Sequence, residues 1–223
     1  MQQLSENLWH LQYELKVLGA DMQRHVAVMR LGAGQVVVHS TGPFTPADVA
    51  AINALGPVGW VLDVMLRHDT FSRQGREAFP QAAFLGPQGF SEVVGFPTGP
   101  LLPAPAEWNG EIEVLRVQGV PSMEEHAVFH APSRTLIVAD LFFDPDPEAS
   151  GWTHFLMSMV AGRKEGPGIS RAVKFTTQDK EAFRESLEEI GRWDFDRIIF
   201  GHGAIVHTGG KQQFHEALAA SGF

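Results

Sequence analysis

Four polar side chains of the types that bind metal ions stand beside strand-like segments of the chain. The ends of strands are where sheet proteins commonly place the polar groups of a site. Three imidazoles and one carboxylate are ligands that zinc, iron and manganese accept. A metal held there would lower the pKa of a bound water and supply hydroxide near neutral pH. The four are His68 after the run 60–66, His126 at the start of the run 127–130, Asp140 after the run 135–139, and His202 after the run 197–200.

Each of these residues also has a simpler explanation. A single histidine beside a strand is commonly a hydrogen-bonded residue at the rim of a fold, and Asp140 can cap the turn that follows it. His202 stands between Gly201 and Gly203, which let the backbone turn sharply and let a ligand approach closely. Four further side chains are candidates for supporting the site or lining its pocket, with structural hydrogen bonding as the alternative: Asp69, His39, His130 and His154.

The elements that must position these residues follow from the apolar pattern. Two alternating segments, 24–31 and 35–39, flank a glycine-rich turn and predict a β-hairpin. A helix is expected after Thr45, with Pro46 at its first position. Further strands are predicted at 60–66, 84–85, 111–117, 127–130, 135–139 and 197–200, and further helices at 152–161, 178–192 and 211–220. Two halves of similar order predict an α/β fold of four layers, in which outer helices cover two sheets.

The composition bounds the class of protein. The chain has 223 residues, of which 44% are hydrophobic, and this is enough for one well-packed domain over residues 1–223. The sequence has no cysteine, which excludes disulfides, thiolate zinc sites, iron–sulfur clusters and a thiol nucleophile. The net charge of −9 argues against a nucleic-acid partner.

The sequence also bears on location and partners. No apolar run reaches the roughly 18–20 residues of a membrane span, and the N-terminus lacks the basic start and apolar stretch of a signal peptide. We therefore expect a cytoplasmic protein that acts on or binds a small molecule, without nucleic-acid or membrane partners. The sequence leaves the oligomeric state open.

Several segments together resemble the metallo-β-lactamase fold superfamily and, within it, the uncharacterised DUF4336-like branch. These segments are 7–9, 38–40, 130–140 and 193–203, and the similarity extends over nearly the whole chain. The resemblance implies an αββα sandwich with a metal site at one edge between the two sheets. It also implies a metal-dependent hydrolase with one or two zinc, iron or manganese ions. The roles implied by the resemblance are the histidine of the middle motif for His126, the metal-bridging carboxylate for Asp140, and the C-terminal histidine ligand for His202.

The first metal motif of that superfamily is altered in this chain. The superfamily has His-X-His-X-Asp-His after a buried strand, and the corresponding segment here, 66–73, contains one histidine. If His68 is the first histidine of the motif, the remaining three ligand positions hold Thr70, Ser72 and Arg73. If His68 is instead the second histidine, none of the other ligands is restored either.

The altered motif favours one metal ion over two. A second ion would keep at most Asp140 and His202 from the protein, and an inward-pointing Arg73 would disfavour it by charge. A catalytic zinc needs only about three protein ligands. One divalent ion, zinc foremost with iron or manganese as alternatives, is therefore feasible on His68 and His126 together with Asp140, His202 or both.

Two functions follow from these observations. The first is a metal-dependent hydrolase in which one ion activates water, with an unknown substrate. The second is a non-catalytic protein of the same fold that binds a small molecule or another protein, and that has no need of a metal.

Overall fold

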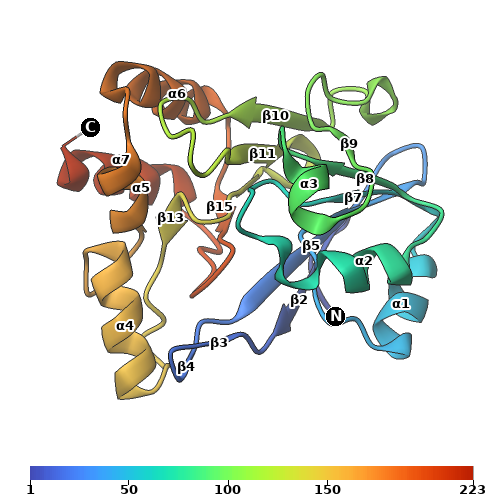
Figure 1. Ribbon diagram of the computed structural model, residues 1–223, viewed down its shortest axis with the longest axis horizontal. Helices are drawn as coiled ribbons and strands as arrows, with labels where there is room; N and C mark the ends of the chain where they lie inside the picture. Colours follow the sequence, from blue (N-terminus) through green and yellow to red (C-terminus); the bar gives the residue numbers. More distant parts are fainter. Residues whose placement is uncertain (223) are drawn as a thin grey trace.

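The computed structural model describes residues 1–222 as two β-sheets packed face to face (Figure 1). The larger sheet has the strand order β1-β2-β5-β6-β7-β8-β9. The strands from β1 to β6 pair antiparallel, and those from β6 to β9 pair parallel. Their bounds are β1 Gln2–Ser5, β2 Leu8–Tyr13, β5 Arg24–Arg30, β6 Val36–His39, β7 Val58–Leu62, β8 Ala83–Gly86 and β9 Gly99–Pro100.

The smaller sheet has the order β10-β11-β12-β15. Its first three strands pair antiparallel, and β15 pairs parallel with β12. Their bounds are β10 Ile112–Arg116, β11 His126–His130, β12 Thr135–Ile137 and β15 Arg197–Ile199.

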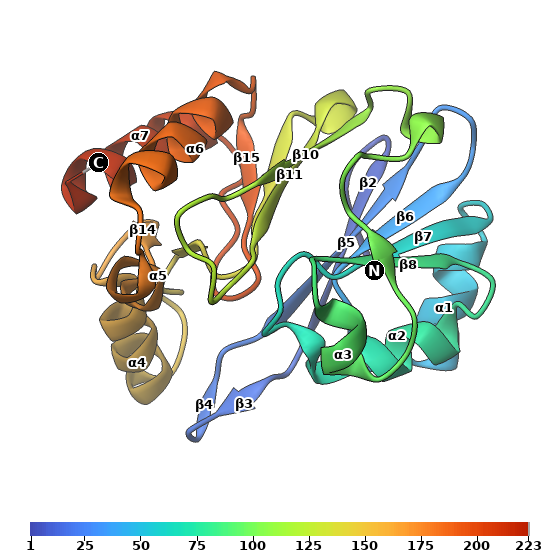
Figure 2. The same cartoon turned by 45° about the horizontal axis from the view of Figure 1, so that its top comes forward.

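Helices cover the outer surface of each sheet (Figure 2). The larger sheet is covered by α1 Pro46–Asn53, α2 Ser72–Ala78 and α3 Phe90–Val94. The smaller sheet is covered by α6 Lys180–Arg192 and α7 Gly210–Ser221. The predicted four-layer αββα sandwich is thereby confirmed.

The side chains of β6 show how the sequence builds these layers. Successive residues of a strand point to opposite faces of the sheet. Val37 accordingly belongs to the apolar cluster that fills the space between the sheets and continues beneath α6 and α7, whereas Val36 and Val38 belong to the cluster beneath the helices α1 to α3. On α6, Phe183 and Leu187 lie four residues apart and both join the first cluster, as expected of an amphipathic helix on a sheet.

A smaller group of elements lies beside the sandwich (Figure 1). It consists of the hairpin β3 Lys16–Val17 and β4 Ala20–Asp21, the pair β13 Phe142–Phe143 and β14 Gly168–Ile169, and the helices α4 Gly151–Ala161 and α5 Arg171–Thr176. Ala20, Phe143 and Leu156 share an apolar cluster that joins the hairpin, β13 and α4.

The structure departs from the expected elements mainly at strand ends. β7 ends at Leu62 rather than at residue 66, because the next residue, Asp63, is buried in a polar network described below. The segment 86–110 contains α3, β9 and a short 3-10 helix, and the sequence predicts no helix where α2, α3 and α5 form. Within residues 1–222, no helix has both the length and the apolarity needed to cross a membrane.

Candidate metal centre

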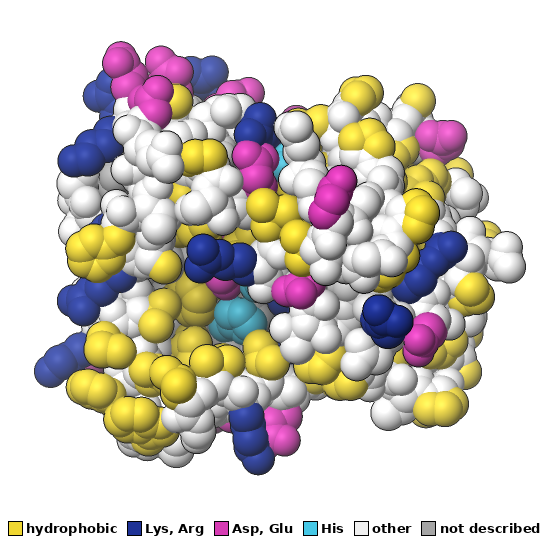
Figure 3. Space-filling model, in the orientation of Figure 1, with side chains coloured by type: hydrophobic (Ala, Val, Ile, Leu, Met, Phe, Trp, Pro, Cys, Tyr) yellow, Lys and Arg dark blue, Asp and Glu magenta, His cyan; other side chains and the backbone are white. Residues whose placement is uncertain are grey.

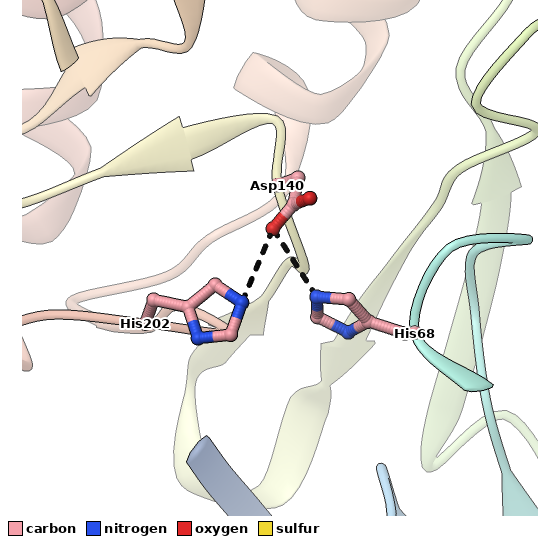
Figure 4. Close-up of side chains that lie close together, drawn as sticks. All are labelled: His68, Asp140 and His202. Carbon is pink, nitrogen blue, oxygen red and sulfur yellow. Dashed lines mark hydrogen bonds and ion pairs between the residues drawn. The ribbon is translucent and has the colours of Figure 1, made fainter. Parts of the chain in front are cut away.

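Three of the four predicted ligands converge where β7, β12 and β15 end. His68 follows β7, Asp140 follows β12 and His202 follows β15. The Nε2 atoms of His68 and His202 lie 3.1 Å and 3.5 Å from the same oxygen, Oδ1 of Asp140 (Figure 4). One ligand atom from each residue lies within 4.8 Å of the other two. The face shown in Figure 3 is hollowed near its centre, and histidine atoms are visible in the hollow.

Two glycines allow this close approach around His202. A Cβ atom on Gly201 would lie 2.6 Å from Cε1 of His68 and 2.9 Å from the carbonyl oxygen of Ala139. Gly203 has a φ of +89°, in the left-handed region that favours glycine. The loop after β15 can therefore pack against the histidine of the loop after β7.

The protonation states suit a cation. Burial lowers the pKa of His68 to about 4, and burial also lowers the pKa of His202. Burial opposes ionisation of Asp140, but the neighbouring His68, His202 and Arg24 outweigh it and lower the pKa of that carboxyl to about 2. At neutral pH the group therefore consists of two neutral imidazoles and one carboxylate, which is the state in which such residues bind metal.

The hydrogen bond of His202 fixes which nitrogen faces the centre. Its Nδ1 lies 2.6 Å from the carbonyl oxygen of Gln23, which accepts a hydrogen bond, so Nδ1 carries the proton. The unprotonated Nε2 then faces the carboxylate of Asp140, and two electron-rich atoms lie 3.5 Å apart. Since ligand atoms lie about 2.0–2.2 Å from zinc, one ion between these atoms would satisfy both. The residues therefore fit a divalent metal.

A buried arginine lies next to this group. The Arg24 guanidinium, 2% exposed, donates from Nη2 to the carbonyl oxygen of His68 at 2.9 Å and from Nε to that of Thr41 at 3.0 Å. Nη2 also lies 3.4 Å from Oδ1 of Asp63, whose carboxylate accepts from Ser72 Oγ at 2.6 Å. The network fixes the backbone of His68 and places a permanent positive charge near the centre.

Arg73, by contrast, is exposed on α2. The charge that the sequence reading assigned to an inward-pointing Arg73 is supplied instead by Arg24. Arg24 lies at the start of β5, far from the altered motif in the sequence.

His126 lies outside the group of three in the part of the chain that the structure describes. The backbone N–H of His126 donates to the carbonyl oxygen of Val64 at 2.9 Å, and its Nδ1 lies 3.1 Å from the carbonyl oxygen of Glu124. Its side chain lines a separate cavity of about 540 Å³, together with Arg116 and residues of the segment 86–102.

The four remaining candidates take different places. Asp69 is exposed at the start of a 3-10 helix directly after His68. His39 is buried at the end of β6, and burial lowers its pKa to about 3. His130 lies at the opposite end of β11 from His126, bonded to Ser133 Oγ at 2.7 Å.

His154 lies on α4, and its Nδ1 is 3.0 Å from the carbonyl oxygen of Asp146. Of these four side chains, His39 lies near Arg24 and His68, whose charges add to the effect of burial in lowering its pKa.

Metallo-β-lactamases are among the solved structures with the same architecture. A metallo-β-lactamase from Pontibacter korlensis matches with a TM-score of 0.66 at 12% identity, over 98% of this chain and 97% of that chain. FIM-1 from Pseudomonas aeruginosa, solved in a mono-zinc form, matches with a TM-score of 0.66 at 9% identity, over 99% and 94% of the two chains. A metallo-β-lactamase from Erythrobacter litoralis gives 0.66 at 12% identity, over 98% and 95%.

The fold and the group of polar residues at its edge thus define an αββα sandwich with a candidate metal centre. The particular fold is that of the metallo-β-lactamases, as the sequence resemblance predicted. No family model matches the chain, and no curated protein matches it. The DUF4336-like branch therefore stays a prediction.

Sequence reasoning missed one residue that acts on the centre, and it left a second with two interpretations. Arg24 reads in the sequence as the first residue of an ordinary strand. The pair Glu124 and Glu125 beside His126 reads either as partners that support the site or as a solvated acidic turn, and the structure shows the carboxylate of Glu125 buried and bonded to the backbone around Asp140. Burial and the nearby Asp140 raise the pKa of Glu125 to about 8. For both residues, the only signal in the sequence is the position of a charged residue immediately before an apolar strand segment.

Proposed function

We propose that this chain is a metal-dependent hydrolase that uses one divalent ion, with His68, Asp140 and His202 as its protein ligands. The observation that carries the proposal is the convergence of three donors from three separate loops, with two neutral imidazole nitrogens facing one carboxylate oxygen. Two histidines and one carboxylate form a known ligand set of catalytic zinc. His126, the fourth predicted ligand, is left out because the structure directs it to a separate cavity.

The charges around the centre support one ion. The side chain of Arg24 is buried beside the group and would repel a second cation. The altered motif also lacks the aspartate and the histidines that would bind that second cation. Zinc suits the mixed nitrogen and oxygen donors, and iron or manganese are the alternatives.

The chain's own residues have separate tasks in this proposal. A bound ion supplies a water molecule with a lowered pKa. Gln23 holds His202 in the tautomer whose Nε2 faces the centre. Arg24 anchors the backbone of His68. The low pKa of Asp140 keeps its carboxylate ionised as a ligand near neutral pH. We propose a small molecule as the substrate, a cytoplasmic location, and membership of the DUF4336-like branch.

The altered first motif supports a second candidate function. Thr70, Ser72 and Arg73 supply no imidazole to the centre, and Ser72 instead bonds to Asp63. A chain that has lost these ligands fits a non-catalytic protein of the metallo-β-lactamase fold that binds a small molecule or a protein.

Metal analysis of purified protein separates the two. Inductively coupled plasma mass spectrometry is applied to the wild type, to His202→Ala and to His215→Ala, a control at an exposed histidine. We expect about one equivalent of metal in the wild type and in the control, and little metal in His202→Ala. Esters, thioesters and phosphodiesters are then screened, and Asp140→Asn should abolish any turnover found. Protein without metal after reconstitution would move the conclusion to the non-catalytic function.

A further inference from the structure

We propose that Glu125 is the positioning residue of the metal centre: its carboxylate holds the Asp140 loop at the distance from His68 that a shared ion requires. The inference deepens the proposed function and rests on it, since Asp140 and His68 are two of the proposed ligands.

The carboxylate of Glu125 binds three successive backbone amides. Oε1 accepts from the N–H groups of Ala139 at 2.8 Å and Leu141 at 3.1 Å, and Oε2 accepts from that of Asp140 at 3.1 Å. Glu125 itself is 3% exposed. A buried donor left unpaired is destabilising, so the backbone at Asp140 cannot turn away without a loss of stability.

The same short segment is bonded to the other ligand loop. The N–H of Leu66 donates to the carbonyl oxygen of Met123 at 3.2 Å, and the N–H of His126 donates to that of Val64 at 2.9 Å. The segment 123–126 therefore holds the loop that leads to His68 through its backbone, and the Asp140 loop through the side chain of Glu125. This one segment therefore links the two loops whose side chains approach to 3.1 Å, at His68 Nε2 and Asp140 Oδ1.

The chemistry of a carboxylate is what this arrangement needs. A buried carboxylate is costly unless it is hydrogen-bonded or paired. Within residues 1–222 the hydrogen bonds of the Glu125 carboxylate run to the three amides, and no cationic side chain pairs with it. A neutral amide at this position has one acceptor oxygen and cannot serve all three donors from two sides. Glutamate is therefore fitted to holding the backbone on both sides of Asp140.

The substitution Glu125→Gln removes one of these bonds with little change in shape. Its oxygen can keep the bonds to Ala139 and Leu141, while its NH₂ group faces the N–H of Asp140. The matched control is Ser186→Ala on α6, which removes a buried hydroxyl that accepts from the N–H of Gln118 at 3.0 Å and donates to the carbonyl oxygen of Ala182 at 2.8 Å. Both variants lose buried hydrogen bonding to the backbone, but only the bond of Glu125 reaches the centre.

Two readouts distinguish positioning from general stability. Zinc affinity is measured by competition with a chelator at pH 9, where Glu125 is ionised in the wild type. We expect a loss of about 10–100-fold in Glu125→Gln with no loss in Ser186→Ala. Equal affinities in the wild type and Glu125→Gln would overturn the proposal. The visible spectrum of the cobalt-substituted protein should also change in Glu125→Gln, because it reports ligand geometry, and should stay the same in the control.

Amide hydrogen exchange of the metal-free protein gives an independent test. In the wild type the amides of residues 139, 140 and 141 should be protected, and in Glu125→Gln exchange should accelerate at Asp140. Unprotected amides in the wild type would overturn the proposal even if the variant does not fold. A wild type that binds no zinc would refute the proposed function, whereas the exchange result would still decide whether Glu125 holds the Asp140 loop.

Discussion

Replacing Asp63 with asparagine removes the negative charge that faces Arg24 inside the protein. Asp63 is 1% exposed and Arg24 is 2% exposed, so water cannot compensate the unpaired guanidinium. Removing one partner of a buried ion pair costs about 3–5 kcal/mol. For a protein of this size each kcal/mol lowers the melting temperature by about 2–4 °C, so Asp63→Asn should melt about 6–20 °C below the wild type.

The control for Asp63→Asn is an exposed ion pair of the same chemistry. Arg134 Nη2 lies 2.9 Å from Asp194 Oδ1, with the two side chains 56% and 76% exposed. Asp194→Asn should therefore lower the free energy of unfolding by less than about 1 kcal/mol. Both variants are unfolded in urea at pH 8, because burial raises the pKa of Asp63 to about 6 and the carboxyl must be ionised in the wild type.

A second consequence of Asp63→Asn concerns the metal. Since Arg24 donates to the backbone of His68, loss of its counter-charge should also weaken zinc binding, whereas Asp194→Asn should not. Equal unfolding free energies for the two variants would refute the reasoning that Arg24 and Asp63 form a desolvated ion pair beside the centre.

Three further predictions test the centre and the buried histidines. Gly201→Ala places a Cβ atom 2.6 Å from Cε1 of His68 and 2.9 Å from the carbonyl oxygen of Ala139. The substitution should therefore lower the free energy of unfolding, measured by calorimetry, by about 1–3 kcal/mol and weaken metal binding. An unchanged stability and an unchanged metal affinity would contradict the close approach. Zinc at 100 times its Kd should stabilise the wild type by about 2.7 kcal/mol, and a chelator should remove this gain. The gain should be absent in Asp140→Asn. If the gain persists in that variant, Asp140 is not a ligand. Burial lowers the pKa of His130 to about 4, so this ring stays neutral in the folded protein while it is protonated in the unfolded chain below its ordinary value of 6.5. Stability that is complete above pH 6.5 should therefore fall toward pH 4, by up to about 1.4 kcal/mol per pH unit for each such group, and the slope of urea unfolding against pH should be shallower in His130→Gln.

Local patterns in the sequence determined much of the fold. Thr45 caps α1 and forms a capping box with Asp48, and the expected hairpin forms between β5 and β6. These elements were predictable because their signals, a cap and a two-residue alternation, lie within a few residues of each other. The positions of His68, Asp140 and His202 at strand ends were predictable for the same reason.

Long-range contacts explain what the sequence did not reveal. Arg24 and Asp63 are separated by 39 residues. Because both are charged, the sequence predicts an exposed position for each. Their burial follows from the fold, which brings the start of β5 and the end of β7 together so that the two side chains pair. Glu125 reaches the amides of residues 139–141 only because β11 and β12 pair antiparallel. His126 follows directly in the chain but takes a different direction, toward the 540 Å³ cavity.

The most direct test of the account is anomalous diffraction at the zinc edge from crystals of the wild type grown with zinc. The account predicts one strong anomalous peak, bonded to Nε2 of His68, to the Asp140 carboxylate and to Nε2 of His202, with Arg24 still bonded to the carbonyl oxygen of His68. Two peaks at the centre, or a peak held by other residues with none between these three, would contradict it.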